Sequence, residues 1–184
     1  MFYHTSCWTD TGCDGEFDDQ SPINIETSGT TLDESGIPLK FLNYDLEPNS
    51  YTLTNDGRRL VLTVDTNSTD VPQFAQLTDS STFDIYELHS INFNWKSEHQ
   101  IDGTNSEMEI QFIHFNMKYG STFDIALSGD GESSTDFSNV PSDALAILSI
   151  MVEETKFNND NYEELLKYLL KVYSNNATRI TKFR

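Results

Sequence analysis

Hydrophobic and polar residues alternate along two stretches near the middle of the chain, and this alternation predicts β-strands. In the stretch 90–95, Asn92 and Asn94 share one face, because successive side chains of a strand point to opposite faces. In the stretch 107–115, the same period assigns Gln111 to one face of its own strand. The pattern therefore predicts two strands whose three amide side chains converge on one point.

Other patterns predict further strands and loops. Residues 51–54 and 60–64 flank an Asn-Asp-Gly turn, which is typical of a hairpin. Residues 36–41 predict a short strand after an acidic turn. The stretches 74–86 and 125–141 are acidic and rich in small polar residues, and we expect loops there.

A capping-box pattern at residues 160–163 predicts the start of one clear helix. Apolar residues then recur every three or four positions, which is typical of one face of a helix. They are Tyr162, Leu165, Leu166, Leu169 and Tyr173. The apolar run 144–152 fits a buried strand or a buried helix equally well on pattern alone.

The length of 184 residues is sufficient for one domain with a sizeable core. We expect an irregular N-terminal arm over residues 1–19 and one folded domain over residues 20–184. An aromatic content of 12% favours a folded, β-rich protein over a disordered one. No stretch approaches the roughly 18 apolar residues of a membrane span, and the first residues lack the apolar core of a signal peptide.

Acidic residues dominate the charge of the chain. Thirty Asp and Glu residues stand against 11 Lys and Arg residues, which gives a net charge of −19. Such a field repels nucleic acids, anionic lipid headgroups and sulfated glycans, and it attracts cations and basic proteins. The charge argues against a nucleic-acid or glycosaminoglycan partner, although a role in solubility alone explains it equally well.

Four motifs, in order along the chain, resemble the α-type carbonic anhydrases. Residues 20–25 match the opening Gln-Ser-Pro-Ile-Asn-Ile of that family, and residues 92–95 stand where the family has His-Phe-His-Trp. Residues 97–103 match Ser-Glu-His-x-Val-Asp-Gly, and residues 109–116 match Glu-Leu-His-Leu-Val-His-Trp-Asn. The resemblance implies a mainly β (α+β) fold with a central twisted mixed sheet and a few peripheral helices. It also implies that the run 144–152 is a buried strand.

The resemblance further implies that the zinc site of the family is lost. The family binds zinc through three histidines, whose positions hold Asn92, Asn94 and Gln111 in this chain. Zinc prefers imidazole and thiolate donors, whereas neutral amide oxygens suit calcium or magnesium and bind weakly without a carboxylate. We therefore expect no metal, no cofactor and no enzyme activity, with the amides bonded to one another or to trapped water.

Other parts of the catalytic machinery are altered in the same way, according to the resemblance. Arg58 stands at the position of a proton-shuttling histidine, and an arginine stays protonated and relays no proton. Glu98 and Glu109 match carboxylates that orient the zinc-bound hydroxide and a zinc ligand, so we expect them to satisfy buried polar groups instead. The Thr-Thr-Pro-Pro segment of the family has no match before Arg184, which implies a C-terminally shortened fold with an exposed sheet edge.

The four histidines offer no replacement for the missing ligands. His89 and His114 differ in parity from the amides of their own strands, unless a bulge intervenes. For His99, which lies in a loop, we expect a packing or hydrogen-bonding role. His4 lies in the N-terminal arm.

Two cysteines and two glycosylation sequons favour the secretory pathway. Extracellular members of the resembled family pair an early cysteine with a late one, and this chain has only Cys7 and Cys13. We expect these two to form a disulfide in an oxidising compartment, while free or intermolecular thiols stay open alternatives. Asn67 and Asn176 begin Asn-x-Thr sequons, so we expect an extracellular or secreted glycoprotein.

Three functions are open at the level of the sequence. The favoured hypothesis is a non-catalytic carbonic-anhydrase-like subunit that binds a protein partner, or a second copy of itself, across the exposed sheet edge. It involves no nucleic acid and no direct membrane span. The second is an acidic extracellular matrix or cation-binding protein, supported by the charge, although the acidic residues are dispersed. The third is residual carbonic anhydrase or esterase activity.

Overall fold

The computed structural model describes residues 21–34, 36, 38–46, 50–65, 70–77, 82–128, 140–157, 159–173 and 179–182. Strands predominate, and they are β1 (Asn24–Ile25), β2 (Lys40–Leu42), β3 (Ser50–Asn55), β4 (Leu60–Val64), β5 (Gln73–Leu77), β6 (Phe83–Trp95), β7 (Gln100–Ile101), β8 (Thr104–Asn105), β9 (Met108–Asn116), β10 (Leu145–Val152) and β11 (Arg179–Lys182). The helices are η3 (Thr27–Gly29), α1 (Phe123–Ser128), η4 (Asp160–Tyr162) and α2 (Glu163–Tyr173). The mainly β fold is thereby confirmed.

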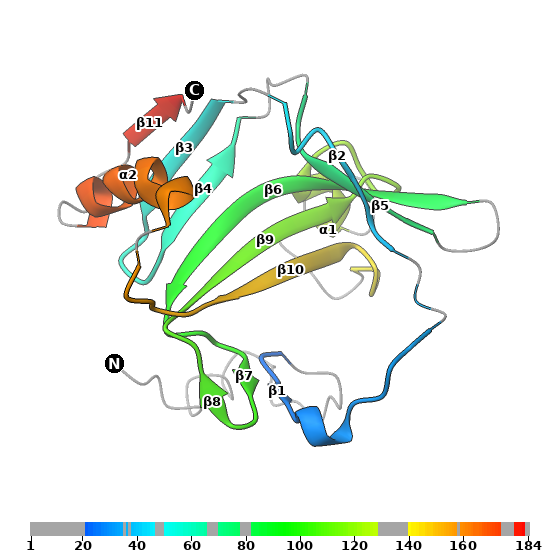
Figure 1. The fold of residues 1–184 in the computed structure, drawn as a ribbon. Coiled ribbons are helices and arrows are strands. Elements are labelled where there is room, and N and C mark those ends of the chain that lie inside the picture. Colours follow the sequence, from blue (N-terminus) through cyan, green and yellow to red (C-terminus); the bar gives the residue numbers. More distant parts are fainter. Residues whose placement is uncertain are drawn as a thin grey trace, which may run out of the picture.

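One large sheet organises the molecule. Its strands follow the order β10-β9-β6-β4-β3-β11, while β5 pairs with β6 and β2 pairs with β5 (Figure 1). The described pairings within it are antiparallel, and the predicted hairpin is confirmed as β3 and β4. The 13-residue strand β6 pairs with β4, β5 and β9, so it connects the two ends of the sheet.

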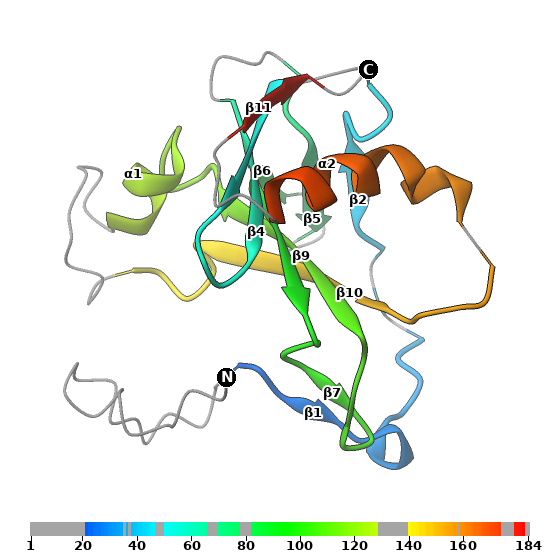
Figure 2. The same cartoon turned by 90° about the vertical axis from the view of Figure 1, so that its left-hand side faces the viewer.

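A small three-stranded sheet joins the first motif of the chain to the loop after β6 (Figure 2). In it, β1 pairs in parallel with β7, which pairs antiparallel with β8. The side-chain oxygen of Asn24 accepts a 2.8 Å hydrogen bond from the Gly103 amide. The Asp102 carboxylate accepts 2.8 Å bonds from the amide and the hydroxyl of Thr27. These bonds fix the loop between β6 and β9.

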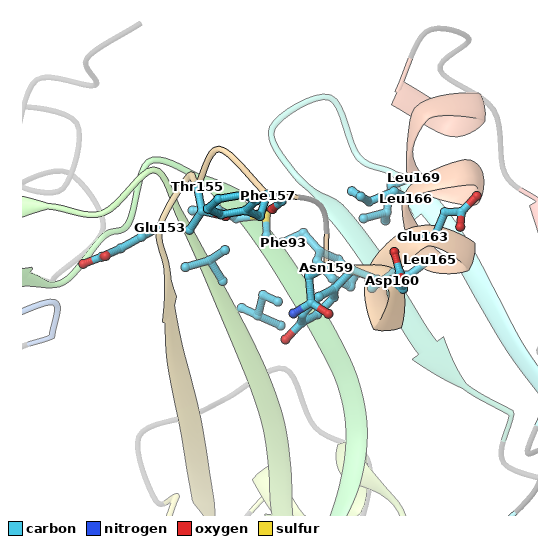
Figure 3. Close-up of a pocket in the computed structure, with 14 residues that line it drawn as sticks. Phe93, Glu153, Thr155, Phe157, Asn159, Asp160, Glu163, Leu165, Leu166 and Leu169 are labelled. Carbon is cyan, nitrogen blue, oxygen red and sulfur yellow. The ribbon is translucent and has the colours of Figure 1, made fainter.

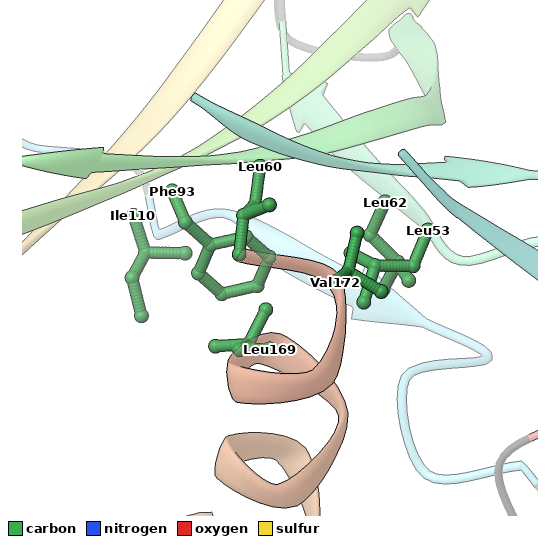
Figure 4. Close-up of a cluster of buried hydrophobic side chains, with 7 residues drawn as sticks. All are labelled: Leu53, Leu60, Leu62, Phe93, Ile110, Leu169 and Val172. Carbon is green, nitrogen blue, oxygen red and sulfur yellow. The ribbon is translucent and has the colours of Figure 1, made fainter. Parts of the chain in front are cut away.

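Helix α2 covers one face of the large sheet and forms the main core with it (Figure 4). The buried residues of this core are Leu53, Leu60, Leu62, Phe93, Ile110, Leu169 and Val172. Each such side chain contributes roughly 1.5–3 kcal/mol on leaving water. Phe93 lies between Asn92 and Asn94 in the sequence, so alternation along β6 turns the two asparagines toward the opposite face.

Three predicted elements need correction. The loop expected over residues 74–86 is strand at both of its ends, because β5 reaches Leu77 and β6 begins at Phe83, while residues 78–81 lie outside the described part. The stretch is stabilised as strand by packing, since Phe74 is buried and stacks on Tyr86 with ring centroids 4.8 Å apart. The strand expected over residues 36–41 begins later in the chain and is shorter, because β2 covers only Lys40–Leu42. The loop expected over 125–141 begins within helix α1, and residues 129–139 lie outside the described part.

The run 144–152 is strand β10, as the resemblance implies, but it is not buried. Leu145, Ile147 and Ile150 are 37%, 51% and 45% exposed. The reason is its position, because β10 pairs with β9 and with no other described strand. The prediction of a buried strand was therefore wrong in burial, although right in conformation.

The predicted helix is confirmed as α2, with differences in its start and its face. The short helix η4 precedes it, and the cap is Asn159, whose side chain accepts from the Asn161 amide. Tyr162 and Leu166 are 39% and 46% exposed, so they do not belong to the buried face. That face consists of Leu165, Tyr168, Leu169 and Val172. Among the described helices, none has the length and apolarity that crossing a membrane requires.

Candidate functional site

Strands β6 and β9 lie side by side and place the three amides on one face of the sheet. Asn92 stands directly opposite Gln111, and Asn94 stands directly opposite Glu109. Residues in such positions have Cβ atoms about 5 Å apart. Gln111 and Asn94 are 5% and 8% exposed, and Asn92 is half-buried. A carboxylate therefore belongs to the same cluster as the amides.

Glu109 is the centre of a hydrogen-bond network with no exposed surface. Its Oε2 accepts from the backbone amides of Glu98 and His99 at 2.8 and 3.1 Å. Its Oε1 lies 2.8 Å from Nδ1 of His99 and 2.9 Å from Nε2 of Gln111. Burial alone would raise the pKa of Glu109, but hydrogen bonds from Gln111, His99 and Ser149 outweigh it and lower the pKa to about 2.

Gln111 is held by two carboxylates at once. Its Nε2 donates to Oε2 of Glu98 and to Oε1 of Glu109, each at 2.9 Å. An amide nitrogen carries two hydrogens and accepts no bond, so these contacts use the whole nitrogen end of the side chain. The carbonyl oxygen is the one atom of this side chain with metal-ligand character.

Asn94 is less well satisfied than its neighbours. Its Nδ2 is buried and has no hydrogen-bond partner among the described residues. A buried donor without an acceptor costs about 1–3 kcal/mol relative to a solvated one. The amide cluster therefore combines a saturated carboxylate with one unpaired donor.

The described histidines each have a structural partner. His99 is bound to Glu109, in agreement with the hydrogen-bonding role expected for it. His114 is fully buried, with Nδ1 2.9 Å from the Phe112 carbonyl and Nε2 2.6 Å from the Tyr44 hydroxyl. Nδ1 therefore carries the hydrogen and Nε2 accepts from Tyr44. Burial lowers the pKa of His114 to about 4.

A bulge does interrupt β6 at His89, because the register with β9 shifts between Leu88 and Ser90. The imidazole nevertheless packs away from the amides. It stacks on Phe123 of α1 with the ring centroids 3.9 Å apart. Burial lowers its pKa, which keeps the ring neutral near pH 7. His4 lies outside the described residues.

Arg58 lies in the exposed turn between β3 and β4. In this turn Gly57 adopts a φ of 87°, which favours glycine, and the Asp56 carboxylate accepts 2.8 Å bonds from the amides of Arg58 and Arg59. The remaining candidate residues lie outside the described part of the chain. They are Cys7, Cys13, Asn67 and Asn176.

Ser149 is the member of the network that the sequence patterns missed. It stands opposite Gln111 on β10, and its side chain hydrogen-bonds the Glu109 carboxylate. It is the single polar residue within the apolar run 144–152. This one polar position in an apolar run was the feature of the sequence that could have indicated the role of Ser149.

The donor chemistry of the cluster does not fit zinc. Protein zinc sites use thiolate, imidazole and carboxylate ligands. Asn92, Asn94 and Gln111 supply only neutral amides, and the Glu109 carboxylate is already occupied by hydrogen-bond donors. The described residues contain no group of three His, Cys, Asp or Glu side chains that could hold a metal ion.

Comparison with known proteins gives a family match over nearly the whole chain. The family model for eukaryotic-type carbonic anhydrase matches residues 4–184. Carbonic anhydrase 6 of Mus musculus is 29% identical over 178 residues, which are 92% of this chain and 49% of the relative. Carbonic anhydrase 7 of Homo sapiens is 31% identical over 142 residues, 74% of this chain and 47% of the relative. Carbonic anhydrase 4 of Rattus norvegicus is 27% identical over 157 residues, which are 83% of this chain and 45% of the relative. The chain spans about half the length of these relatives.

Proposed function

Because this chain belongs to the eukaryotic-type carbonic anhydrase family, we propose that it is a non-catalytic member that acts through protein–protein contacts. In this proposal Asn92, Asn94 and Gln111 occupy the positions of the zinc-binding histidines, and Arg58 occupies that of the proton shuttle. Each replacement removes a function that an imidazole alone supplies, either a neutral nitrogen ligand or a group that exchanges protons near pH 7.

One observation carries the proposal. Both hydrogens of the Gln111 amide nitrogen are bound by the carboxylates of Glu98 and Glu109. Glu109 also receives bonds from His99 and Ser149, so its buried charge is compensated without a cation. In our interpretation, Glu98 and Glu109 have changed from carboxylates that orient a metal centre into supports of the fold.

We also propose that the protein enters the secretory pathway. The support comes from the sequence, which has two acceptor sequons at Asn67 and Asn176 and two cysteines, Cys7 and Cys13, near its start. The proposal includes a disulfide between the cysteines, with free or intermolecular thiols as the alternative, and glycans on the two asparagines. Mass spectrometry of the protein from a eukaryotic secretion host, with and without reductant and glycosidase, tests both modifications.

The decisive experiment measures zinc content and carbon dioxide hydration on the same purified protein after incubation with zinc. We expect no stoichiometric zinc and no rate above the uncatalysed reaction. About one tightly held zinc per chain, together with hydration, would refute the proposal.

A matched gain-of-binding variant makes a negative result informative. The triple substitution Asn92→His, Asn94→His and Gln111→His restores three imidazoles while leaving Glu109 in place to accept from the new side chain at position 111. We expect this variant to bind about one zinc per chain when the wild type binds none. If both proteins fail to bind zinc, the amide substitutions are not the cause, and our account of the loss is wrong.

The acidic charge favours one competing function, a cation-binding or matrix protein. The net charge of −19 attracts divalent cations. Titration calorimetry with calcium distinguishes this function from the first, because a saturable heat at low millimolar calcium or below supports it. Absence of heat leaves the protein-binding proposal as the better one.

A further inference from the structure

The hydroxyl of Ser149 joins β10 to the hydrogen-bond network around Glu109. Ser149 stands directly opposite Gln111 of β9, whereas Glu109 stands opposite Met151. The bond from Ser149 to the Glu109 carboxylate is therefore a diagonal contact between neighbouring strands, which long side chains can span. The other described donors to this carboxylate belong to β9 and to the loop after β6. Ser149 thus adds a third segment of the chain to the network.

The network is confined to one face of β9, because core residues occupy the other face. Ile110 stands between Glu109 and Gln111, so alternation along the strand points it to the opposite side of the sheet. There Ile110 and Phe93 line a cavity of about 450 Å³ between the sheet and α2 (Figure 3). The donors that satisfy the Glu109 carboxylate therefore share its own face of the sheet.

The Glu109 carboxylate has more donors than lone-pair positions. An ionised carboxylate only accepts hydrogen bonds, and its two oxygens offer about four positions for them. Four donors come from the amides of Glu98 and His99, the ring of His99 and the side chain of Gln111. The hydroxyl of Ser149 is a fifth. Because the donors share one acceptor, each bond is weaker than it would be with one donor fewer.

We propose that Ser149 is a specificity-determining residue that disfavours zinc at this site, in addition to the replacement of the three histidines. A histidine that binds a metal through one ring nitrogen is supported by a carboxylate that accepts from the other nitrogen. At position 111 this carboxylate is Glu109, for which the Ser149 hydroxyl competes. Ser149 therefore weakens the support of a zinc ligand. This inference rests on the proposed function and deepens it, because part of the loss of zinc then comes from β10.

The first test adds Ser149→Ala to the triple variant Asn92→His, Asn94→His, Gln111→His. We expect the quadruple variant to bind zinc about tenfold more tightly than the triple variant, measured by competition with a chromogenic chelator. The expectation follows because a group that hydrogen-bonds a metal-bound histidine changes metal affinity about 10–100-fold. Equal or weaker zinc binding by the quadruple variant would overturn the inference.

Ser121→Ala in the triple variant is the matched control. Ser121 is an exposed serine like Ser149, but it stands just before α1 and makes no described bond to Glu109. It should leave the zinc affinity unchanged. A role of Ser149 in strand pairing alone predicts that Ser149→Ala lowers stability without tightening zinc binding.

The second test needs no metal and uses the otherwise wild-type chain. Ser149→Ala removes one donor from Glu109, so the bond from Gln111 should strengthen, and its side-chain amide hydrogens should move downfield in a nitrogen–proton NMR spectrum. Ser121→Ala should leave these signals in place. Unchanged Gln111 signals in Ser149→Ala would show that the hydroxyl does not compete for the carboxylate, and the inference would be wrong.

The zinc measurements distinguish this inference from the proposed function. If the triple variant binds zinc and Ser149→Ala does not tighten the binding, only the inference about Ser149 is wrong. If neither the triple nor the quadruple variant binds zinc, the account of the lost histidines is wrong as well. If the wild-type chain itself binds zinc and hydrates carbon dioxide, the proposed function is refuted, whatever the effect of Ser149→Ala.

Discussion

The side-chain nitrogen of Gln111 lies 2.9 Å from Oε1 of Glu109 and donates a hydrogen bond to it. The two residues share a face of β9, so a neutral amide stabilises a buried carboxylate two positions away. Because Gln111 also binds Glu98, it links the sheet to the loop after β6. The hydrogen-bond partners of this network all belong to the chain itself, and we expect the network to stabilise the folded state.

Glu109→Gln should lower the free energy of unfolding by about 2–3 kcal/mol at pH 7. The pKa of Glu109 falls from an ordinary 4.5 to about 2 in the folded chain. The folded state therefore favours the ionised form, and this stability is fully present above about pH 4.5. It is lost as the pH falls toward 2. Urea unfolding between pH 2 and 7 measures both effects.

Glu107→Gln is the matched control, because Glu107 precedes the same strand and is exposed. It should change the free energy of unfolding by less than about 0.5 kcal/mol. If Glu109→Gln has an equally small effect, then the hydrogen bonds to this carboxylate do not stabilise the folded chain.

The sequence alone was sufficient to predict that the amides share a face of the sheet, but it did not predict the strands around them correctly. Alternation placed Asn92 and Asn94 on one face, because the period of a strand is a local property. The exposure of Ile147 on β10 depends on which strands lie beside it, and no local pattern reports that. Strand β5 was missed for a related reason, since Phe74 finds its partner Tyr86 only through tertiary packing.

The resemblance located Glu109 but not the full set of its partners. The family motif supplied Glu109 and its loop neighbour Glu98, whereas the bond from Ser149 depends on the register between β9 and β10. A register is fixed by pairing across the sheet and is not encoded in one strand alone. The centre of such a network is therefore easier to predict from the sequence than its periphery.

His114 should make the protein lose stability in mild acid. Burial lowers its pKa from 6.5 to about 4, so the folded state binds fewer protons than the unfolded state between these values. The stability that the low pKa of His114 contributes to the folded state is fully present above pH 6.5 and is lost as the pH falls to about 4. We expect the free energy of unfolding to drop by about 2–3 kcal/mol between pH 7 and pH 4.5.

Two variants separate the titration of His114 from its packing. His114→Gln removes the titrating group, so its stability should depend much less on pH in this window, whatever its stability at pH 7. Tyr44→Phe removes the 2.6 Å hydrogen bond but keeps the imidazole buried, so the pH dependence should persist. A wild-type protein whose stability is constant from pH 7 to pH 4.5 would contradict the burial of a neutral imidazole.

Asn94→Leu should stabilise the chain by about 1 kcal/mol, although it replaces a buried polar residue. The Nδ2 of Asn94 has no partner among the described residues, so leucine, which has a similar shape, removes an unpaired donor. Asn116 is the matched control, because it is fully buried on β9 and its Nδ2 donates to Asp84 and to the Asp143 carbonyl, each at 3.3 Å. Asn116→Leu should destabilise by about 1–3 kcal/mol. Urea unfolding at pH 7 compares the two variants, and an equal loss in both would show that the Asn94 amide is paired in solution.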